Sequence, residues 1–344
     1  MAQGSTPHRV AVLDDYQGLS VSHFDALDKA VFDVTVFRDT LLPWNHPDTP
    51  QHVKEALVHR DLIARLPNLK LLLTTGLRNN SLDLGFFKEQ SIPVAGTADK
   101  STGTQVGTNS TTEHCVTLVL ALARGIARDD AAVKAGLWQT GFATGLTGKT
   151  FAVVGLGRLG VATAKILRMA FGMRIIAWSQ NLTQEIADEK AKSAGFPVED
   201  PSGEKTFKVV SREELFSEAD VLSVHLVLSD RTRDLIKADD LNRMKKNAFL
   251  INTSRGPLIH EGDLLAILKK GAIQGAALDV YGIEPLPTDS EWRTTKWGED
   301  GRSQVLLTPH MGYVEPGTLN AWYGQQVDNV KRWHEGDVLV NPLA

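Results

Sequence analysis

Residues 151–160, Phe-Ala-Val-Val-Gly-Leu-Gly-Arg-Leu-Gly, join an apolar strand to the pattern Gly155-x-Gly157-x-x-Gly160. Helical sequence follows over 161–169. In a dinucleotide-binding turn the first glycine permits the tight bend, the second admits a pyrophosphate, and the third lets helix pack on strand. The N-terminus of the helix offers free N–H groups to the phosphates. The stretch therefore predicts a Rossmann-type nucleotide-binding fold.

The next predicted strand ends at Ala177-Trp178-Ser179-Gln180-Asn181. A strict NAD enzyme carries Asp or Glu near Ser179 to hold the ribose hydroxyls, and no carboxylate stands there. The absence removes a charge that would repel a 2′-phosphate, but no Arg or Lys stands beside Ser179 in the sequence to attract one. The sequence leaves NAD(H) and NADP(H) both open.

Predicted strands alternate with helical segments such as 52–66 along the whole chain, which favours α/β architecture. Residues 111–128 predict one long helix and 315–334 another. We expect a Rossmann-type doubly wound parallel sheet and, as the family resemblance stated below implies, a flavodoxin-like α/β substrate domain with a cleft between them. The substrate (catalytic) domain is expected over 1–111 and 308–344, and the NAD(P)-binding domain over 112–307. The predicted strands are 10–13, 31–37, 69–75, 92–95, 151–154, 174–178, 221–226, 249–252, 275–279 and 305–307.

The composition limits the classes of function. A chain of 344 residues is long enough for about two domains, and 42% hydrophobic with 23% charged residues excludes wholesale disorder. A formal charge of −4 gives no footprint for nucleic acid or an anionic membrane. The single cysteine, Cys115, cannot form an intrachain disulfide, so we expect a reducing, cytoplasmic location and no metal site.

Three polar residues stand in turns directly after predicted strands: Arg255 in 252–256, Glu284 in 279–285 and His310 in 307–312. Ligands of open parallel sheets lie beyond the C-terminal strand ends, so these side chains are expected to converge. Arginine matches a carboxylate with two donors and can polarise a carbonyl group. Histidine is the natural proton donor near neutral pH, and a neighbouring carboxylate favours its charged form.

At these residues the sequence resembles the D-isomer-specific 2-hydroxyacid dehydrogenase family, which includes glyoxylate/hydroxypyruvate reductases and phosphoglycerate dehydrogenases. The resemblance covers nearly the whole chain. It rests on Thr111-Thr-Glu-His114, Gly136-Leu-Trp138, Leu146-Thr-Gly-Lys-Thr150, Asn252–Gly256, Ala277-Leu-Asp-Val280, Glu284-Pro285 and Thr308-Pro-His310.

The resemblance implies NAD(P)H-dependent, reversible reduction of a small 2-oxo acid to the D-2-hydroxy acid. Arg255 would bind the substrate carboxylate and carbonyl, His310 would be the acid/base, and Glu284 would assist it. Leu77 and Arg78 would lie on the loop that holds the substrate carboxylate. The implied cofactor contacts are Gly155, Gly157, Gly160, Arg158 and Leu159 along the pyrophosphate, Ser179 at the ribose, His225 and Thr232 over the cofactor, and Thr253 and Asp279 at the nicotinamide.

Some features depart from the family pattern. The stretch 286–304 lengthens the interval between Glu284 and His310, which suggests a lid or an interface loop. Tyr313 replaces a small residue, and Arg78 adds a charge that favours a larger substrate, such as a 2-keto sugar acid, beside glyoxylate and hydroxypyruvate. The family also implies a homodimer through the helix that starts near Thr111.

Other functions stay open. Formate dehydrogenases share the fold, but they need no proton donor and differ where Glu284 stands, so this residue argues against them. A single-core phosphoglycerate dehydrogenase remains an alternative. So does a non-catalytic, nucleotide-sensing scaffold like the corepressors that adopt this fold.

Overall fold

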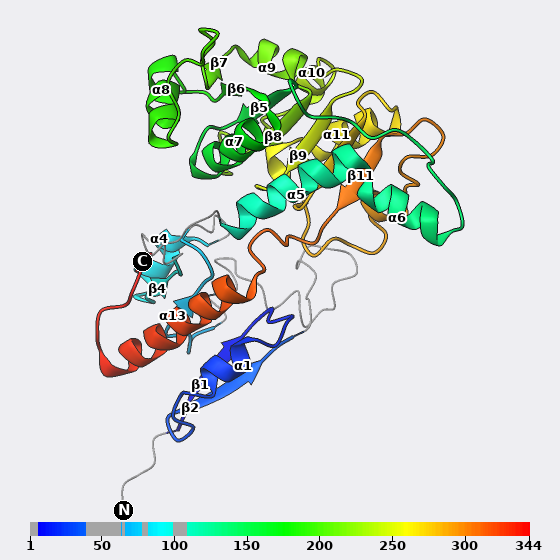
Figure 1. Cartoon of the computed structure of the whole chain (residues 1–344). Coiled ribbons are helices and arrows are strands. Elements are labelled where there is room, and N and C mark those ends of the chain that lie inside the picture. The colour runs from blue at the N-terminus through cyan, green and yellow to red at the C-terminus, as the bar shows by residue number, and fades with distance from the viewer. Residues whose placement is uncertain (1–5, 39–62, 64–65, 78–81, 99–108) are drawn as a thin grey trace, which may run out of the picture. The chain divides into compact units, whose positions relative to one another are not determined.

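A computed structural model describes residues 6–38, 63, 66–77, 82–98 and 109–344. The chain forms two compact units (Figure 1). The split unit comprises Met1–Val106 and Tyr313–Ala344, and the inserted unit comprises Gly107–Gly312. The boundaries thus lie at 106/107 and 312/313, where the sequence had suggested 111/112 and 307/308.

The inserted unit is built on a seven-stranded sheet in the order β11-β10-β9-β8-β5-β6-β7, and every pair of neighbours is parallel. The chain order reverses between β5 and β8, which is the switch point of a doubly wound sheet. The predicted α/β class with a Rossmann-type doubly wound parallel sheet is therefore confirmed. The strands are β5 (Thr150–Val154), β6 (Arg174–Trp178), β7 (Lys208–Val209), β8 (Val221–Val224), β9 (Phe249–Asn252), β10 (Gly275–Leu278) and β11 (Gln304–Leu307).

Helices cover both faces of this sheet. One face carries α5 (Ser110–Arg124), α7 (Arg158–Phe171) and α8 (Gln184–Ser193). The other carries α9 (Arg212–Glu218), α10 (Ala238–Leu241) and α11 (Glu261–Lys269). The short elements α6 (Ile126–Lys134), η1 (Gly256–Leu258) and α12 (Glu291–Thr294) complete the unit.

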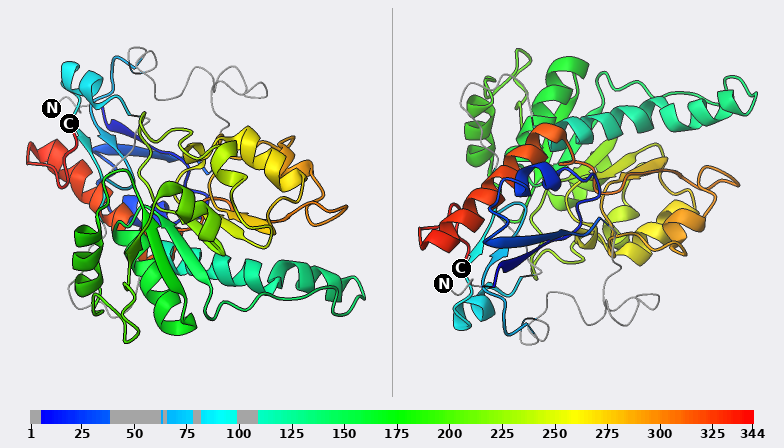
Figure 2. Two further views of the ribbon diagram at one scale, coloured as in Figure 1. Left: turned by 90° about the horizontal axis from the view of Figure 1, so that it is seen from above. Right: turned by 90° about the horizontal axis from the view of Figure 1, so that it is seen from below.

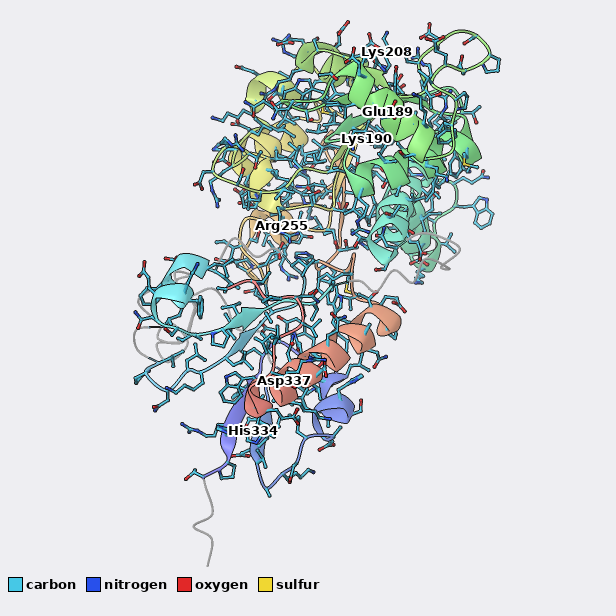
Figure 3. The ribbon with its side chains drawn as sticks, turned by 90° about the vertical axis from the view of Figure 1, so that its left-hand side faces the viewer. Glu189, Lys190, Lys208, Arg255, His334 and Asp337 are labelled. Carbon is cyan, nitrogen blue, oxygen red and sulfur yellow. The ribbon has the colours of Figure 1, made fainter. Side chains whose placement is uncertain are left out.

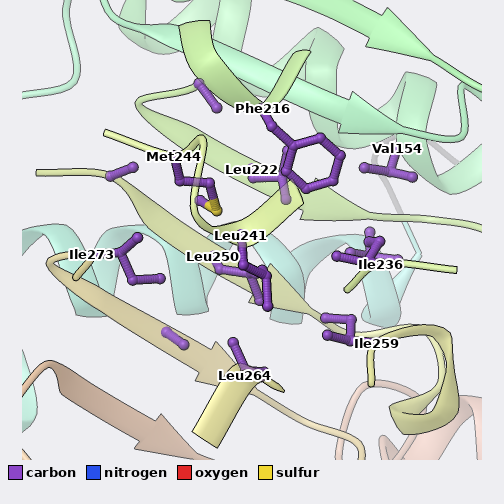
Figure 4. Close-up of a cluster of buried hydrophobic side chains, with 14 of the residues drawn as sticks. Val154, Phe216, Leu222, Ile236, Leu241, Met244, Leu250, Ile259, Leu264 and Ile273 are labelled. Atoms are coloured by element: carbon purple, nitrogen blue, oxygen red, sulfur yellow. The ribbon is translucent and has the colours of Figure 1, made fainter. Parts of the chain in front are cut away.

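The core of the inserted unit has two layers because strand side chains alternate between the faces of the sheet. In β5, Ala152 and Val154 pack on the α9–α11 side, whereas Phe151 and Val153 pack on the α5–α7 side. Strands buried on both faces read as continuous apolar runs, which is why 151–154 could be predicted. Figure 4 shows the first layer, where Phe216 of α9 packs near Val154 and Leu222.

Two features of the inserted unit differ from the predictions. The long helix predicted over 111–128 is broken at Gly125, which adopts a left-handed conformation with φ of 65° and ends α5 before α6 begins. The edge strand β7 was not predicted, because only two residues pair with β6 and no apolar run marks them.

The stretch 286–304 was expected to be a lid or an interface loop. Part of this stretch packs on its own unit: Trp292 in α12 is 3% exposed and belongs to the α9–α11 layer. Its indole N–H donates to Glu261 of α11 at 2.5 Å, and Trp297 donates to the carbonyl oxygen of Trp292 at 2.9 Å.

The split unit contains two parallel strand pairs. β1 (His8–Val12) pairs with β2 (Phe32–Val36), and β3 (Leu72–Leu73) pairs with β4 (Val94–Ala95). Helices α1 (Ser20–Phe24), α4 (Leu84–Glu89) and α13 (Pro316–Glu335) accompany them. Leu319, Tyr323 and Val327 of α13 share a core with β1, β2 and α1, so the C-terminal segment completes the fold of the N-terminal one. The predicted helix 52–66 lies almost entirely outside the described residues.

Within the described part of the chain, no helix has the length and apolar character needed to cross a membrane. No group of His, Cys, Asp or Glu among those residues could hold a metal ion.

Candidate active site

His310 and Glu284 form an ion pair at the C-terminal edge of the sheet. The Nδ1 atom of His310 lies 2.6 Å from Oε2 of Glu284, and the two side chains are 30% and 33% exposed. The second oxygen of Glu284 accepts the backbone N–H of Tyr281 at 2.8 Å. The carboxylate is thus fixed on one side and offers its charge to the imidazole on the other.

The backbone of His310 is held in the left-handed region, with φ of 54°, which is uncommon for a residue with a side chain. The His310 N–H donates to the carbonyl oxygen of Asp279 at 2.8 Å. The carboxylate of Asp279 accepts the backbone N–H groups of Met311 at 2.7 Å and Gly312 at 3.0 Å. Asp279 therefore imposes the conformation that aims His310.

Asp279 is 1% exposed and has further donors around it. Its Oδ1 atom accepts the Thr308 hydroxyl at 2.6 Å and lies 3.2 Å from Nε2 of His114 in α5. Burial opposes ionisation, but the hydrogen bonds from His114, Thr308 and Met311 outweigh it and lower the pKa of the Asp279 carboxyl. Sequence reasoning assigned Asp279 to the nicotinamide only and missed this supporting role.

Arg255 directly follows β9 in a turn shaped by Asn252. The Asn252 side chain donates to the Arg255 carbonyl oxygen at 3.0 Å and accepts the Ser254 N–H at 3.1 Å. The guanidinium is exposed and donates to the Ser254 carbonyl oxygen at 2.7 Å. Gly256 lies so close to Tyr281 that a Cβ atom there would overlap its backbone carbonyl group. The turns after β9 and β10 are therefore in direct contact.

Tyr281 links these turns, and sequence reasoning did not single it out. Besides its N–H contact with Glu284, its single hydroxyl proton is shared between two acceptors, the carbonyl oxygens of Leu278 at 3.1 Å and Thr308 at 3.0 Å. Burial raises the pKa of Tyr281, so its hydroxyl keeps its proton. The only signal in the sequence is its position between Asp279 and Glu284.

The glycine turn has the shape that each glycine was expected to give it. Gly155 has φ of 98°, and a Cβ atom on Gly160 would lie 2.5 Å from the Gly155 carbonyl oxygen. A Cβ atom on Gly157 would meet nothing within 4 Å, so the backbone faces open space there. Gly157 caps α7 without a side-chain hydrogen bond, and Arg158 and Leu159 form the first turn of that helix. This cradle fits a pyrophosphate.

A cavity of about 300 Å³ opens beside the turn. It contains four of the predicted contacts, namely Gly155, Gly157, Ser179 and His225. It also contains residues not singled out from sequence: Leu156, Asn181, Leu182, Ile186, Lys190, Leu226 and Val227. No lysine stands beside Ser179 in the chain, yet the fold brings Lys190 into the same cavity.

His225 carries an unsatisfied polar atom at this cavity. Its Nε2 atom lies 2.9 Å from the Ser223 hydroxyl, whereas Nδ1 is buried and has no hydrogen-bond partner among the described residues. Burial lowers the pKa of His225 to about 4, so the ring is neutral at pH 7. A neutral imidazole with a spare nitrogen fits a polar group of a bound dinucleotide.

The other predicted residues do not line this cavity. The Thr232 hydroxyl closes a turn by donating to the Val227 carbonyl oxygen at 2.7 Å. Thr253 is buried directly after β9. Leu77 belongs to the split unit, follows Gly76 and is 48% exposed. Arg78 lies outside the described residues.

A doubly wound parallel sheet, a glycine cradle at its switch point and a neighbouring cavity define a dinucleotide-binding oxidoreductase domain. A sequence profile of the D-isomer specific 2-hydroxyacid dehydrogenase, NAD binding domain, matches residues 116–312. The chain belongs to this family, whose members are NAD-dependent oxidoreductases of 2-hydroxy acids.

Individual proteins similar to this chain include 2-hydroxyacid oxidoreductases. A glyoxylate reductase of Aeropyrum pernix is 32% identical over 290 residues, which cover 82% of this chain and 78% of that protein. A solved phosphoglycerate oxidoreductase of Vibrio cholerae is 27% identical with a TM-score of 0.78, covering 96% of this chain and 99% of the other. D-lactate dehydrogenase of Escherichia coli, 22% identical with a TM-score of 0.73, covers 98% of this chain and shares the fold.

Proposed function

We propose that this protein reduces a small 2-oxo acid to the D-2-hydroxy acid, reversibly, with His310 as the acid/base and Arg255 as the substrate-binding cation. The observation that carries the proposal is the His310–Glu284 ion pair at 2.6 Å, together with the contact between the turn of Glu284 and the turn of Arg255. Such pairs suit proton transfer at neutral pH, because the carboxylate stabilises the charged imidazole.

Arg255, His310 and Glu284 are proposed to have different roles in the reaction. The bound reduced nicotinamide supplies the hydride. Arg255 binds the substrate carboxylate through two donors and polarises the adjacent carbonyl group. Since Nδ1 of His310 is engaged by Glu284, Nε2 is the atom that gives the proton to the developing hydroxyl. We keep Arg158, Leu159, Thr232, Thr253 and Asp279 as proposed cofactor contacts.

A substrate panel tests the proposal. Oxidation of NADH and NADPH would be followed through the loss of absorbance of the reduced nicotinamide, with glyoxylate, hydroxypyruvate, a 2-keto sugar acid and 3-phosphohydroxypyruvate as substrates. We expect turnover with at least one of them. His310→Gln should abolish turnover while dinucleotide binding, measured by fluorescence, persists. Near-normal kcat in this variant would refute the assignment of His310.

The panel also separates the alternatives. The likeness to a solved phosphoglycerate oxidoreductase favours 3-phosphohydroxypyruvate as the second candidate substrate. A non-catalytic nucleotide-sensing scaffold would bind dinucleotide and turn over no member of the panel.

Leu77 and Arg78 are proposed to hold the substrate carboxylate from the split unit. Gly76 supports a sharp turn before them, with φ of 78° and its N–H donated to the Thr97 hydroxyl at 2.8 Å. Arg78→Ala should lower kcat/KM most for the polyhydroxylated substrate. Equal losses for all substrates would remove Arg78 as a determinant of substrate choice.

We also propose a homodimer through the helix that starts near Thr111, with α6 and the segment after it extending the interface. Large apolar side chains are exposed there, including Trp138 at 76% and Phe142 at 97%, and α6 has no buried residue. In Figure 2 this arm projects beyond the sheet of its own unit. Trp138→Glu with Phe142→Glu should halve the mass measured by light scattering. Val338→Glu, at another exposed apolar residue, is the matched control.

A further inference from the structure

The cavity beside the glycine turn carries positive charge where a strict NAD site would carry negative charge. Its polar side chains next to the expected ribose are Ser179, Asn181 and Lys190. No acidic residue is among the described residues that line it. With His225 neutral, the ammonium of Lys190 is the only full charge among these lining side chains at pH 7.

Lys190 has no ion-pair partner among the described residues, whereas its acidic neighbours do. Asp188 pairs with Lys205 at 3.1 Å, and Glu189 pairs with Lys192 at 2.7 Å. Lys190 is half-buried, and Figure 3 labels it beside Glu189 on α8. The Lys190 ammonium can therefore pair with an anionic group of a ligand that binds in the cavity.

The position of Lys190 is fixed by the helix that carries it. Ile186 and Lys190 are four residues apart on α8, so they share the helix face that lines the cavity. Ala187 and Ala191 bury the adjacent face. The Gln184 side chain ties α8 to the sheet, donating to the Phe207 carbonyl oxygen at 2.9 Å and accepting the Val209 N–H at 2.8 Å.

We propose that Lys190, together with Ser179 and Asn181, binds the 2′-phosphate of NADP(H), and that the protein consequently prefers NADP(H) to NAD(H). The ammonium is a compact charge that suits a phosphate, and the hydroxyl and amide add neutral donors. A bare ribose hydroxyl offers Lys190 no charge to bind. The inference rests on the proposed function, in that the dinucleotide binds at the glycine turn.

The first test measures binding without turnover. Titration calorimetry on the whole protein would compare NADPH with NADH, and adenosine 2′,5′-bisphosphate with 5′-AMP. We expect the 2′-phosphorylated member of each pair to bind at least about tenfold more tightly, the usual size of a hydrogen bond to a charged group. Equal affinities in both pairs would overturn the inference.

The second test assigns the effect to Lys190. Lys190→Gln should reduce the NADPH-to-NADH affinity ratio by roughly tenfold, and Lys190→Arg should keep most of it. Lys192→Gln is the matched control, because Lys192 lies on the same helix, pairs with Glu189 and does not line the cavity. An unchanged ratio in Lys190→Gln would overturn the role of Lys190.

The outcomes separate this inference from the proposed function. If both dinucleotides bind and drive turnover but Lys190→Gln leaves their ratio unchanged, only the inference fails. If neither dinucleotide binds the unmodified protein, both fail. Ser179→Asp adds an independent check: it should shift the ratio toward NADH, since a carboxylate repels the phosphate and accepts from the ribose hydroxyls.

Discussion

At the scale of single residues, the acid/base role proposed for His310 depends on the charge of Glu284 beside its Nδ1 atom. Glu284→Gln keeps the size of the side chain and an acceptor for the Tyr281 N–H, but removes the charge beside Nδ1 of His310. We expect kcat to fall on the order of 10²-fold, the lower range of general acid–base contributions. Dinucleotide affinity should stay unchanged.

The control for this variant is Glu291→Gln, which removes a surface carboxylate that pairs with Lys269 in the same unit. Its kcat should match the unmodified protein. If Glu284→Gln retained full kcat, Glu284 would be a structural acceptor for Tyr281 and nothing more.

The positions of site residues that directly follow strands could be predicted from the sequence. Residues that reach the site from another helix or strand could not. Arg255, Glu284 and His310 stand at strand ends, where parallel topology sets their edge in advance. Tyr281 bridges β10 and β11, and Lys190 reaches the cavity of Ser179 from the next helix. No local pattern encodes either contact, because each depends on how elements pack.

At the scale of elements, the contact between the turns after β9 and β10 couples the turn of Arg255 to the turn that carries Glu284. Gly256→Ala would place a methyl group against the Tyr281 backbone, which cannot yield without moving the turn of Glu284. We expect a loss of stability of about 1–3 kcal/mol, as for overpacking, and a lower kcat. Urea unfolding and steady-state kinetics would measure the two effects.

Gly262→Ala is the matched control, because its nearest neighbour would be the His260 ring at 3.5 Å and the position lies in α11. It should leave kcat unchanged and stabilise the helix by up to about 1 kcal/mol. Equal behaviour of the two alanine variants would mean that the turns after β9 and β10 are not rigidly coupled.

Within the 286–304 stretch, Trp292 anchors α12 to the core of the inserted unit. Trp292 is buried and bonded to Glu261, and a Cβ atom on Gly282 would lie 2.8 Å from that same carboxylate. Trp292→Ala should therefore destabilise the inserted unit by about 3–5 kcal/mol. A mobile lid would instead show altered KM with an unchanged urea midpoint, and that result would contradict the packing.

Sequence patterns located every strand of the seven-stranded sheet except β7. Strands β6 and β9 match the predicted ranges, and β5, β8, β10 and β11 differ from theirs by at most about two residues, whereas β3 and β4 of the split unit are only two residues long where longer strands were predicted. The helix predicted over 111–128 ends early because Gly125 terminates α5. The apolar periodicity continues beyond Gly125 and therefore did not predict this end. A glycine that can adopt the left-handed conformation is therefore a better indicator of a helix end than the helix propensity of the residues around it.

At the scale of the whole molecule, the split unit is discontinuous in sequence because the chain returns to it after the inserted unit. The turn that carries His310 ends the inserted unit, and α13 then packs with β1 and β2. The order of motifs predicted this return, since the tail is helical and follows the last strand of the nucleotide unit. Its packing partners could not be read from the sequence.

The free energy of unfolding should decrease as the pH falls. This direction follows from the pKa shifts of two buried groups, His225 and Asp279. The pKa of His225 is about 4 in the fold against about 6.5 in an unfolded chain, so between these values the unfolded chain binds a proton that the fold excludes. Hydrogen bonds lower the pKa of Asp279 despite its burial, so its contribution, present above about pH 4, is lost as pH falls further.

We therefore expect the free energy of unfolding, measured by urea titration with tryptophan fluorescence, to fall between pH 6.5 and pH 4, by an amount on the order of a few kcal/mol for His225 alone. His225→Gln should flatten this part of the profile, because glutamine can bond Ser223 but does not titrate. His334→Gln, at an exposed ring of the split unit, should keep the original slope. An identical slope in the unmodified protein and in His225→Gln would show that His225 already carries its proton in the fold, and its assignment as a neutral lining residue of the dinucleotide cavity would be wrong.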